Sequence, residues 1–317
     1  MCDERLAWFS ILMCSTSTAF SAPQTFFEYQ LLTPSGETVT LEDATKAIAD
    51  HQVILVGEWH SHSAVHRFQS DLYKALLEKN PKTDLSMEQF SRPAQSTLDQ
   101  YLEDEIGERA LIAHGRAWPN YTSDYRALIE QAKVAQRRVI AANAPRDIVH
   151  CIGQVGPSYI KQLSRKDKKF VAAKLDTSDR PYKAQFMTLM QGMEGKMVEN
   201  MYAAQVSWDE TMAESIANHL KQNPGAHVMH TAGKFHVENG DGIAYSLKKR
   251  SPETNIALIT PVTEIGDTSN SPFVEYQLLV LPLPKQSVGT SGHGGGDYSH
   301  PHVNGHSGCE IASKKER

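Results

Sequence analysis

The string Val53-Ile54-Leu55-Val56-Gly57-Glu58-Trp59-His60 decides the fold of this chain, because it has the pattern of a buried strand that ends at glycine and is followed by histidine. A second string of this kind begins at residue 227 and ends Gly233-Lys234-Phe235-His236. Glycine permits a tight exit from a strand. Such strands are typical of α/β proteins, so the two strings predict that both imidazoles lie at the same edge of one sheet.

Strand and helix patterns alternate along the rest of the chain. Apolar residues at positions 68, 72, 75 and 76 form the stripe of a helix that packs on a sheet. The alternation of strand and helix implies mainly parallel pairing. We therefore predict an α/β fold, with a mostly parallel sheet flanked by helices and a smaller helical subdomain inserted at about residues 146–200. Strands are expected near residues 26–31, 53–56, 84–87, 138–142, 227–231, 255–260 and 273–281.

The composition indicates a globular protein that does not bind nucleic acid. The chain has 317 residues, with 32 basic and 37 acidic side chains and a formal charge of -5. It carries no long stripe of lysine and arginine, which nucleic-acid binding would require. We therefore expect small molecules or proteins as partners. The spacing of the four cysteines matches neither a zinc site nor a disulfide framework.

Both ends of the chain differ in composition from residues 23–284, which we predict to form the folded domain. Residues 1–22 resemble a secretory signal segment and predict export, with Cys14 as a possible site of lipid attachment. Residues 285–317 form a tail rich in glycine and histidine that we expect to be disordered. The tail is either a solvated end or a weak collector of metal or haem.

The loop after the first of these strands is dense in side chains that bind metals. Glu58, His60, His62 and His66 lie within nine residues. In open α/β sheets, ligands bind beyond the carboxyl ends of the strands. Imidazole and carboxylate groups suit zinc, manganese or iron, and imidazole also suits haem.

Other strands bring polar side chains to the same edge. Glu88 follows the third strand and could be a metal ligand, a general base or an acceptor of a structural hydrogen bond. Arg146 follows the fourth strand, beyond Asn143, and could pair with a propionate, a phosphate or Glu88. The sequence carries none of the common glycine-rich or serine motifs of kinases, dehydrogenases and hydrolases.

Aromatic and methionine residues supply further possible contacts for a flat cofactor. Tyr121 and Tyr125 either pack on the core or act as ligands of haem iron. Methionines recur at positions 187, 190, 193, 197 and 201, spaced as on one face of a helix. This face is either part of the core or a flexible apolar wall for haem, with Met193 near its centre.

Five separate blocks of the sequence resemble the ChaN-like haem-binding uptake family, in the superfamily that includes the TIKI-type proteases and the erythromycin esterases. They occur in order over most of residues 53–260. The blocks are residues 54–60, 86–93, 142–146, 204–213 and 232–236, which carry Gly57-Glu58-Trp59-His60, Met87-Glu88-Gln89-Phe90, Asn143-Ala144-Pro145-Arg146, Trp208-Asp209-Glu210 and Gly233-Lys234-Phe235-His236.

The resemblance implies an α/β domain with a smaller helical domain, a role in bacterial haem or iron acquisition, and a homodimer that holds haem between its subunits. It also implies that the Gly-x-x-His motifs ending at His60 and His236 match those thought to hold a catalytic metal in the TIKI-type relatives, with Glu58 or Glu88 assisting. Fold alone does not choose between these functions.

The leading hypothesis is an exported haem-binding protein without enzymatic activity, periplasmic or associated with the outer membrane, with outer-membrane haem-uptake machinery as a possible partner. The expected haem contacts are His60, His62, Tyr121, Tyr125, Arg146, Met193 and His236. The alternative is a hydrolase that depends on a divalent ion such as zinc, manganese or iron. Its expected metal ligands are Glu58, His60, Glu88 and His236.

Overall fold

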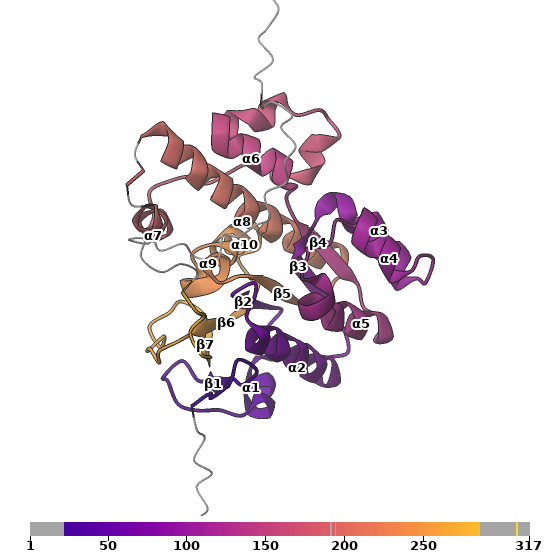
Figure 1. Ribbon diagram of the computed structural model, residues 1–317, viewed down its shortest axis with the longest axis vertical. Coiled ribbons are helices and arrows are strands. Elements are labelled where there is room, and N and C mark those ends of the chain that lie inside the picture. The colour runs from indigo at the N-terminus through magenta and orange to yellow at the C-terminus, as the bar shows by residue number, and fades with distance from the viewer. Residues whose placement is uncertain (1–21, 191, 194, 286–308, 310–317) are drawn as a thin grey trace, which may run out of the picture.

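The computed structural model describes residues 22–285, except 191 and 194, together with Cys309. Within these residues one seven-stranded sheet has the order β1-β7-β6-β2-β5-β3-β4 (Figure 1). The pairing of β1 with β7 is antiparallel, and every other neighbouring pair is parallel. The predicted mostly parallel α/β sheet is therefore confirmed. Its strands are β1 (Gln30–Leu32), β2 (Val53–Glu58), β3 (Thr83–Ser91), β4 (Val139–Asn143), β5 (His227–Gly233), β6 (Ile256–Val262) and β7 (Val274–Leu279).

Helices cover both faces of the sheet and lie in two layers (Figure 1). One core joins the sheet to α2 and α5, and another joins it to α8 and α10. No helix of the described chain is long and apolar enough to cross a membrane. The helices are α1 (Leu41–Ile48), α2 (Ser63–Lys79), α3 (Gln95–Leu102), α4 (Glu108–His114), α5 (Arg126–Val134), α6 (Arg146–Val155), α7 (Pro181–Leu189), α8 (Lys196–Gln222), α9 (Lys234–Val237) and α10 (Ile243–Arg250).

The central position of β2 follows from its sequence. Successive side chains of a strand point to opposite faces, so an unbroken apolar run suits a strand that is covered on both sides. Ile54 and Val56 pack in the core beside α2, whereas Val53 and Leu55 pack in the core beside α8. The parallel neighbours of β2 end at the same side of the sheet, which we call the carboxyl edge.

The predicted helical subdomain is present between β4 and the long helix α8. In residues 146–200 the described chain forms α6, α7, the start of α8 and two short helical turns, Pro157–Gln162 and Asp167–Phe170. The later part of α8 packs on the sheet through Met212, Ala213 and Ile216. One continuous helix therefore joins the subdomain to the sheet.

The predictions for the two ends fall largely outside the described residues. Residues 1–21, which make up nearly all of the predicted signal segment, are outside them, as are residues 286–308 and 310–317 of the predicted tail. The boundaries proposed for these segments therefore stay predictions.

The spacing of the cysteines matched no disulfide framework, yet the structure contains a disulfide. Cys151, buried on α6, is bonded to Cys309, and their Cα atoms are 5.3 Å apart. The two residues are separated by 158 positions. Sequence spacing could not reveal this pair, because disulfide pairing depends on distance in space rather than along the chain.

We expect peptide mapping without reductant to recover one fragment pair that links Cys151 to Cys309, because the two Cα atoms lie within disulfide range. Reduction should separate the two fragments in the mass spectrum. In the Cys309→Ser variant, Cys151 should become available for alkylation after denaturation. Recovery of both cysteines as free thiols from protein kept under oxidising conditions would contradict the pairing.

Candidate functional site

The two Gly-x-x-His strings lie on neighbouring strands at the carboxyl edge. Glu58, the last residue of β2, pairs with Gly233, the last residue of β5. A Cβ atom on Gly233 would lie 3.1 Å from Nε2 of His60 and 3.6 Å from Cδ2 of His236. The predicted meeting of the two imidazoles at one edge is therefore confirmed.

The reason for glycine at position 233 differs from the one expected. Its φ of −51° is ordinary for any residue, so the strand exit does not require a glycine conformation. Glycine is needed because the ring of His60 lies directly against the backbone there. The constraint is close approach rather than backbone freedom.

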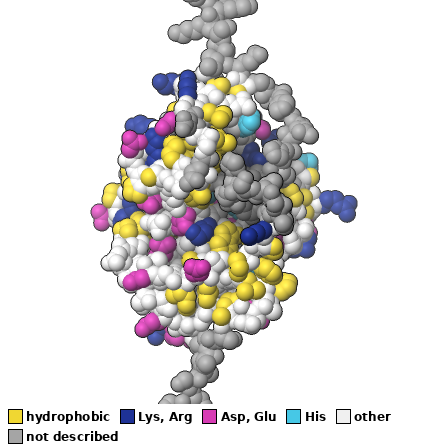
Figure 2. Space-filling view, turned by 60° about the vertical axis from the view of Figure 1, so that its left-hand side comes forward, with side chains coloured by type: hydrophobic (Ala, Val, Ile, Leu, Met, Phe, Trp, Pro, Cys, Tyr) yellow, Lys and Arg dark blue, Asp and Glu magenta, His cyan; other side chains and the backbone are white. Residues whose placement is uncertain are grey.

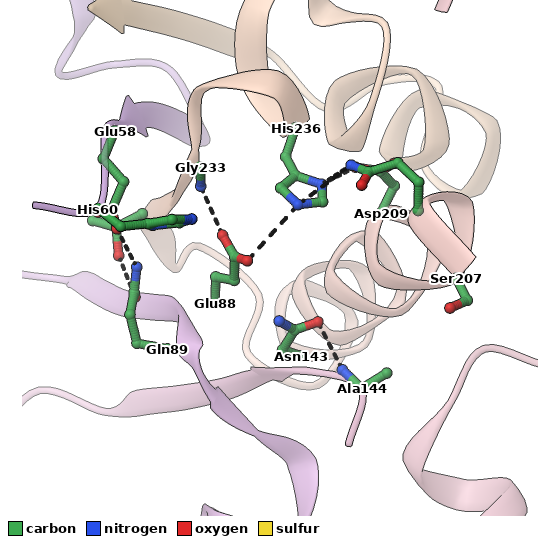
Figure 3. A network of polar contacts seen from close by, with 12 residues as sticks. Glu58, His60, Glu88, Gln89, Asn143, Ala144, Ser207, Asp209, Gly233 and His236 are labelled. Carbon is green, nitrogen blue, oxygen red and sulfur yellow. Dashed lines mark hydrogen bonds and ion pairs between the residues drawn. The ribbon is translucent and has the colours of Figure 1, made fainter. Parts of the chain in front are cut away.

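Glu58 is the centre of a buried network of hydrogen bonds (Figure 3). Its Oε1 accepts from Nδ1 of His60 at 2.8 Å, from Nε2 of Gln89 at 2.9 Å and from the hydroxyl of Tyr125 at 2.7 Å. Its Oε2 accepts from Nε2 of Gln69 at 2.7 Å. These donors come from the β2 loop, β3, α2 and the helical turn Tyr121–Tyr125, so the carboxylate joins four separate segments.

His66 completes this network from α2. Its Nδ1 lies 3.1 Å from Oε1 of Gln69, and its Nε2 lies 3.1 Å from the carbonyl oxygen of His60. The amide of Gln69 cannot be reversed, because its nitrogen donates to Glu58. Both ring nitrogens of His66 therefore face oxygen atoms. Its Nδ1 is 4.0 Å from Oε2 of Glu58.

These contacts keep Glu58 ionised although it is almost fully buried. Burial alone raises the pKa of Glu58, but the hydrogen bond from His60 and the charges of His66 and His60 outweigh it. The net result lowers the pKa to about 2. The carboxylate therefore remains a fixed negative charge beside His60.

His236 lies between two other carboxylates (Figure 3). Its Nδ1 is 2.7 Å from Oδ1 of Asp209, and its Nε2 is 3.7 Å from Oε1 of Glu88. The second oxygen of Glu88 accepts from the backbone N–H of Gly233 at 2.7 Å. Burial lowers the pKa of His236, but the two carboxylates outweigh this effect and raise it above its usual value. His236 is therefore placed to hold a proton.

The sequence reasoning missed several polar residues of this region. Gln69 and Gln89 fix Glu58, and Asp209 orients His236. His230 is also buried: its Nδ1 contacts Oγ of Ser86 at 2.8 Å, and its Nε2 has no hydrogen-bond partner among the described residues. Burial lowers the pKa of His230 to about 4. The sequence feature that could have revealed these residues is a polar side chain within an otherwise apolar strand or on the apolar face of a helix.

Three predicted haem contacts lie inside the protein. His62 precedes α2, and its Nε2 is 2.8 Å from the carbonyl oxygen of Leu281. Tyr125 donates its hydroxyl to Glu58, and burial raises its pKa well above its usual value. Tyr121 is buried, and its hydroxyl has no hydrogen-bond partner among the described residues.

The two remaining predicted haem contacts lie in the helical subdomain. Arg146 is the first residue of α6, directly beyond the carboxyl end of β4. Met193 lies in the turn before α8 and exposes 42% of its surface. The binding roles assigned to these residues stay predictions.

The four predicted metal ligands do not form a ready metal centre. The oxygens of Glu58 already accept four hydrogen bonds, and Nδ1 of His236 is held by Asp209. Among the described residues, no group of three or more histidine, cysteine, aspartate or glutamate side chains is arranged to hold a metal ion. The residues in this arrangement do not fit a divalent metal, and the hydrolase stays a prediction.

The sequence relates this site to a known family. Residues 44–247, more than half of the chain, match the family described as haem-binding uptake, Tiki superfamily, ChaN. No functionally curated protein matches the chain significantly.

Three solved structures are similar to the chain to different degrees. A structure described as cofacial heme binding to ChaN of Campylobacter jejuni is 17% identical, with a TM-score of 0.62, and the alignment covers 79% of this chain and 96% of that one. An erythromycin esterase, EreC, is 12% identical, with a TM-score of 0.42 and coverage of 80% and 83%. A succinoglycan biosynthesis protein is 15% identical, with a TM-score of 0.42 and coverage of 75% and 73%.

Acid should destabilise the protein through Glu58. Its pKa of about 2 in the folded protein is below the ordinary 4.5, so its stabilisation is complete above pH 4.5 and is lost as the pH falls toward 2. We expect the free energy of unfolding, measured from urea unfolding curves, to fall by roughly 3 kcal/mol over this pH range. The Glu58→Gln variant should lack this dependence on pH. The control is Asp71→Asn, which removes a half-exposed carboxylate on α2. Its free energy of unfolding should depend on pH as that of the wild type does. If the free energy of unfolding depended on pH equally in Glu58→Gln and in the wild type, the low pKa assigned to Glu58 would be wrong.

Gly233→Ala should destabilise the protein by about 1 to 3 kcal/mol, because the new methyl group would lie only 3.1 Å from the ring of His60, which is hydrogen-bonded to Glu58. Gly107→Ala, where a Cβ meets nothing within 4 Å, should cost much less. In a His60→Ala background most of the cost of Gly233→Ala should disappear in a double-mutant cycle. An unchanged cost in that background would show that His60 is not the obstacle.

Proposed function

Because the chain belongs to the family of haem-binding uptake proteins named ChaN, in the Tiki superfamily, we propose that it is an exported protein that binds haem at the carboxyl edge and acts in bacterial haem or iron uptake. The observation that carries the proposal is the arrangement of His60. This imidazole is partly exposed at the edge of the sheet and is hydrogen-bonded to a buried, ionised carboxylate.

His60 has the chemistry of an axial iron ligand. Its side chain is 18% exposed, whereas His62, Tyr121, Tyr125 and His236 are buried. Since Glu58 is ionised and can only accept, Nδ1 of His60 carries a proton, so Nε2 is the ring nitrogen that could ligate iron. A histidine that ligates a metal commonly donates its other ring N–H to a carboxylate. When bound, haem would supply the iron that this nitrogen can ligate.

Aromatic rings surround the loop that carries His60. The ring of Trp118 packs edge-on against His60, with centroids 4.9 Å apart. Trp59 and Phe26 both contact His62, which anchors the same loop. Phe26 and the neighbouring Phe27 are exposed by 39% and 64%. Apolar and aromatic side chains are the lining that a porphyrin requires.

One face of the molecule combines hydrophobic and basic side chains (Figure 2). Figure 2 turns forward the side of the molecule on which α7 and α9 lie in Figure 1. Hydrophobic side chains gather on the lower half of this face, and lysine or arginine side chains lie at their upper border (Figure 2). We assign Arg146 to a propionate and Met193 to the apolar wall.

The disulfide supports export. Disulfides persist in oxidising compartments such as the periplasm and are rare in the cytosol. The bond between Cys151 and Cys309 is therefore consistent with a periplasmic or outer-membrane-associated protein. We extend the proposal to a homodimer, as the resemblance of the sequence blocks implies, and to outer-membrane uptake machinery as the source of the haem.

Titration with hemin tests the proposal. Wild-type protein should shift the Soret band and saturate at a fixed stoichiometry, and His60→Ala should weaken binding by roughly tenfold or more because it removes the iron ligand. His114→Ala, which removes an exposed histidine at the end of α4, is the matched control and should bind as wild type.

Three results would contradict the proposal in different ways. A featureless titration of the wild type removes haem binding. Wild-type affinity in His60→Ala removes His60 as the ligand. Binding that persists in His60→Ala but is lost in a variant ending at residue 285 moves the haem to the histidine-rich tail.

A further inference from the structure

Five of the ten methionines of the chain lie within residues 187–201. The proposed haem contact of Met193 accounts for only one of them. We propose that the thioethers of Met190, Met193 and Met197 form a binding site for a soft monovalent metal ion, Cu(I). This site goes beyond haem binding and does not depend on it.

The methionines of this segment differ from the others in their exposure. Among the described residues, the methionines elsewhere in the chain, Met87, Met212 and Met229, are fully buried in the two cores beside the sheet. Met193 and Met197 instead expose 42% and 56% of their surface. An apolar side chain gains little from packing at such a position, whereas its polarisable sulfur is open to a ligand.

The backbone brings the three methionines to one turn. α7 ends at Leu189, and the N–H of Met193 donates to the carbonyl oxygen of Met190 at 3.0 Å, which closes a tight turn. Gly195 then takes a φ of +74°, a value that favours glycine, and α8 begins at the next residue. Met197 therefore lies in the first turn of α8.

The packing of α7 on α8 places Met190 beside that first turn. The hydroxyl of Tyr182 accepts from Nε2 of Gln205 at 3.1 Å, and one turn farther along α7 the rings of Phe186 and Tyr202 lie 5.5 Å apart. The two helices therefore run antiparallel, as a hairpin at the left of Figure 1. Met190 lies one turn beyond Phe186, opposite the first turn of α8, which is one turn before Tyr202.

The donor atoms select the class of metal. Residues 187–201 contain no histidine or cysteine, and the carboxylate of Glu199 is paired with Nζ of Lys183 at 3.0 Å. Soft thioethers favour Cu(I). Zinc sites use imidazole, carboxylate or charged thiolate ligands, which neutral thioethers do not replace. The turn therefore suits Cu(I) rather than Zn(II).

The first test uses Ag(I), a soft monovalent ion that keeps its oxidation state. Protein labelled with carbon-13 at the methionine methyl groups is titrated with Ag(I) and observed by NMR. The resonances of Met190, Met193 and Met197, assigned from single Met→Leu variants, should shift together and saturate. The resonances of the buried Met212 and Met229 should stay in place. Unchanged resonances of the three proposed ligands would overturn the inference.

The second test measures Cu(I) affinity by competition with bicinchoninate in the presence of ascorbate. The double variant Met193→Leu/Met197→Leu should lower the affinity by roughly tenfold or more, because it removes two of the three sulfur ligands. Leucine keeps the volume and apolar character of methionine, so the fold should be retained. Met212→Leu, which makes the same change in the core beside α8, is the matched control and should bind Cu(I) as wild type does.

Two further results would count against the site. Equal Cu(I) affinity in the double variant and the wild type would show that these thioethers are not ligands. A shift of the same methyl resonances with Zn(II) would show that the turn does not select a soft ion. If the double variant does not fold, the Ag(I) titration of the wild type decides. Hemin binding is measured separately, so a featureless hemin titration removes the proposed function and leaves the Cu(I) site standing.

Discussion

The carboxylate of Glu58 lies at the end of the central strand, where desolvation is costly unless the oxygens accept hydrogen bonds. The donors come from α2, β3 and the turn Tyr121–Tyr125, so each of these segments must reach the same point. This requirement fixes the loop after β2 and the ring of His60 within it. The position of the candidate iron ligand is thus a consequence of satisfying one buried charge.

The second half of the site depends on the first through Gly233. Its N–H binds Glu88, and its missing side chain leaves room for His60. His236 follows three residues later and is oriented by Asp209, which lies on α8. Because α8 begins in the helical subdomain, Asp209 connects the helix of that subdomain to His236.

One scaffold can therefore present two different imidazoles. His60 meets an ionised carboxylate that leaves its outer nitrogen suited to iron, whereas His236 is buried between two carboxylates and is suited to holding a proton. Fold does not choose between these uses. The family match and the aromatic surroundings of His60 favour haem.

The sequence by itself determined the parallel α/β sheet and the edge at which His60 and His236 meet, because apolar strands that end at a short polar loop are local patterns. It could not show that Gln69, Gln89 and Asp209 hold those rings, nor that Cys151 pairs with Cys309. Only the tertiary structure decided these points. A hydrogen bond or disulfide between distant segments depends on distances in space, which no local spacing encodes.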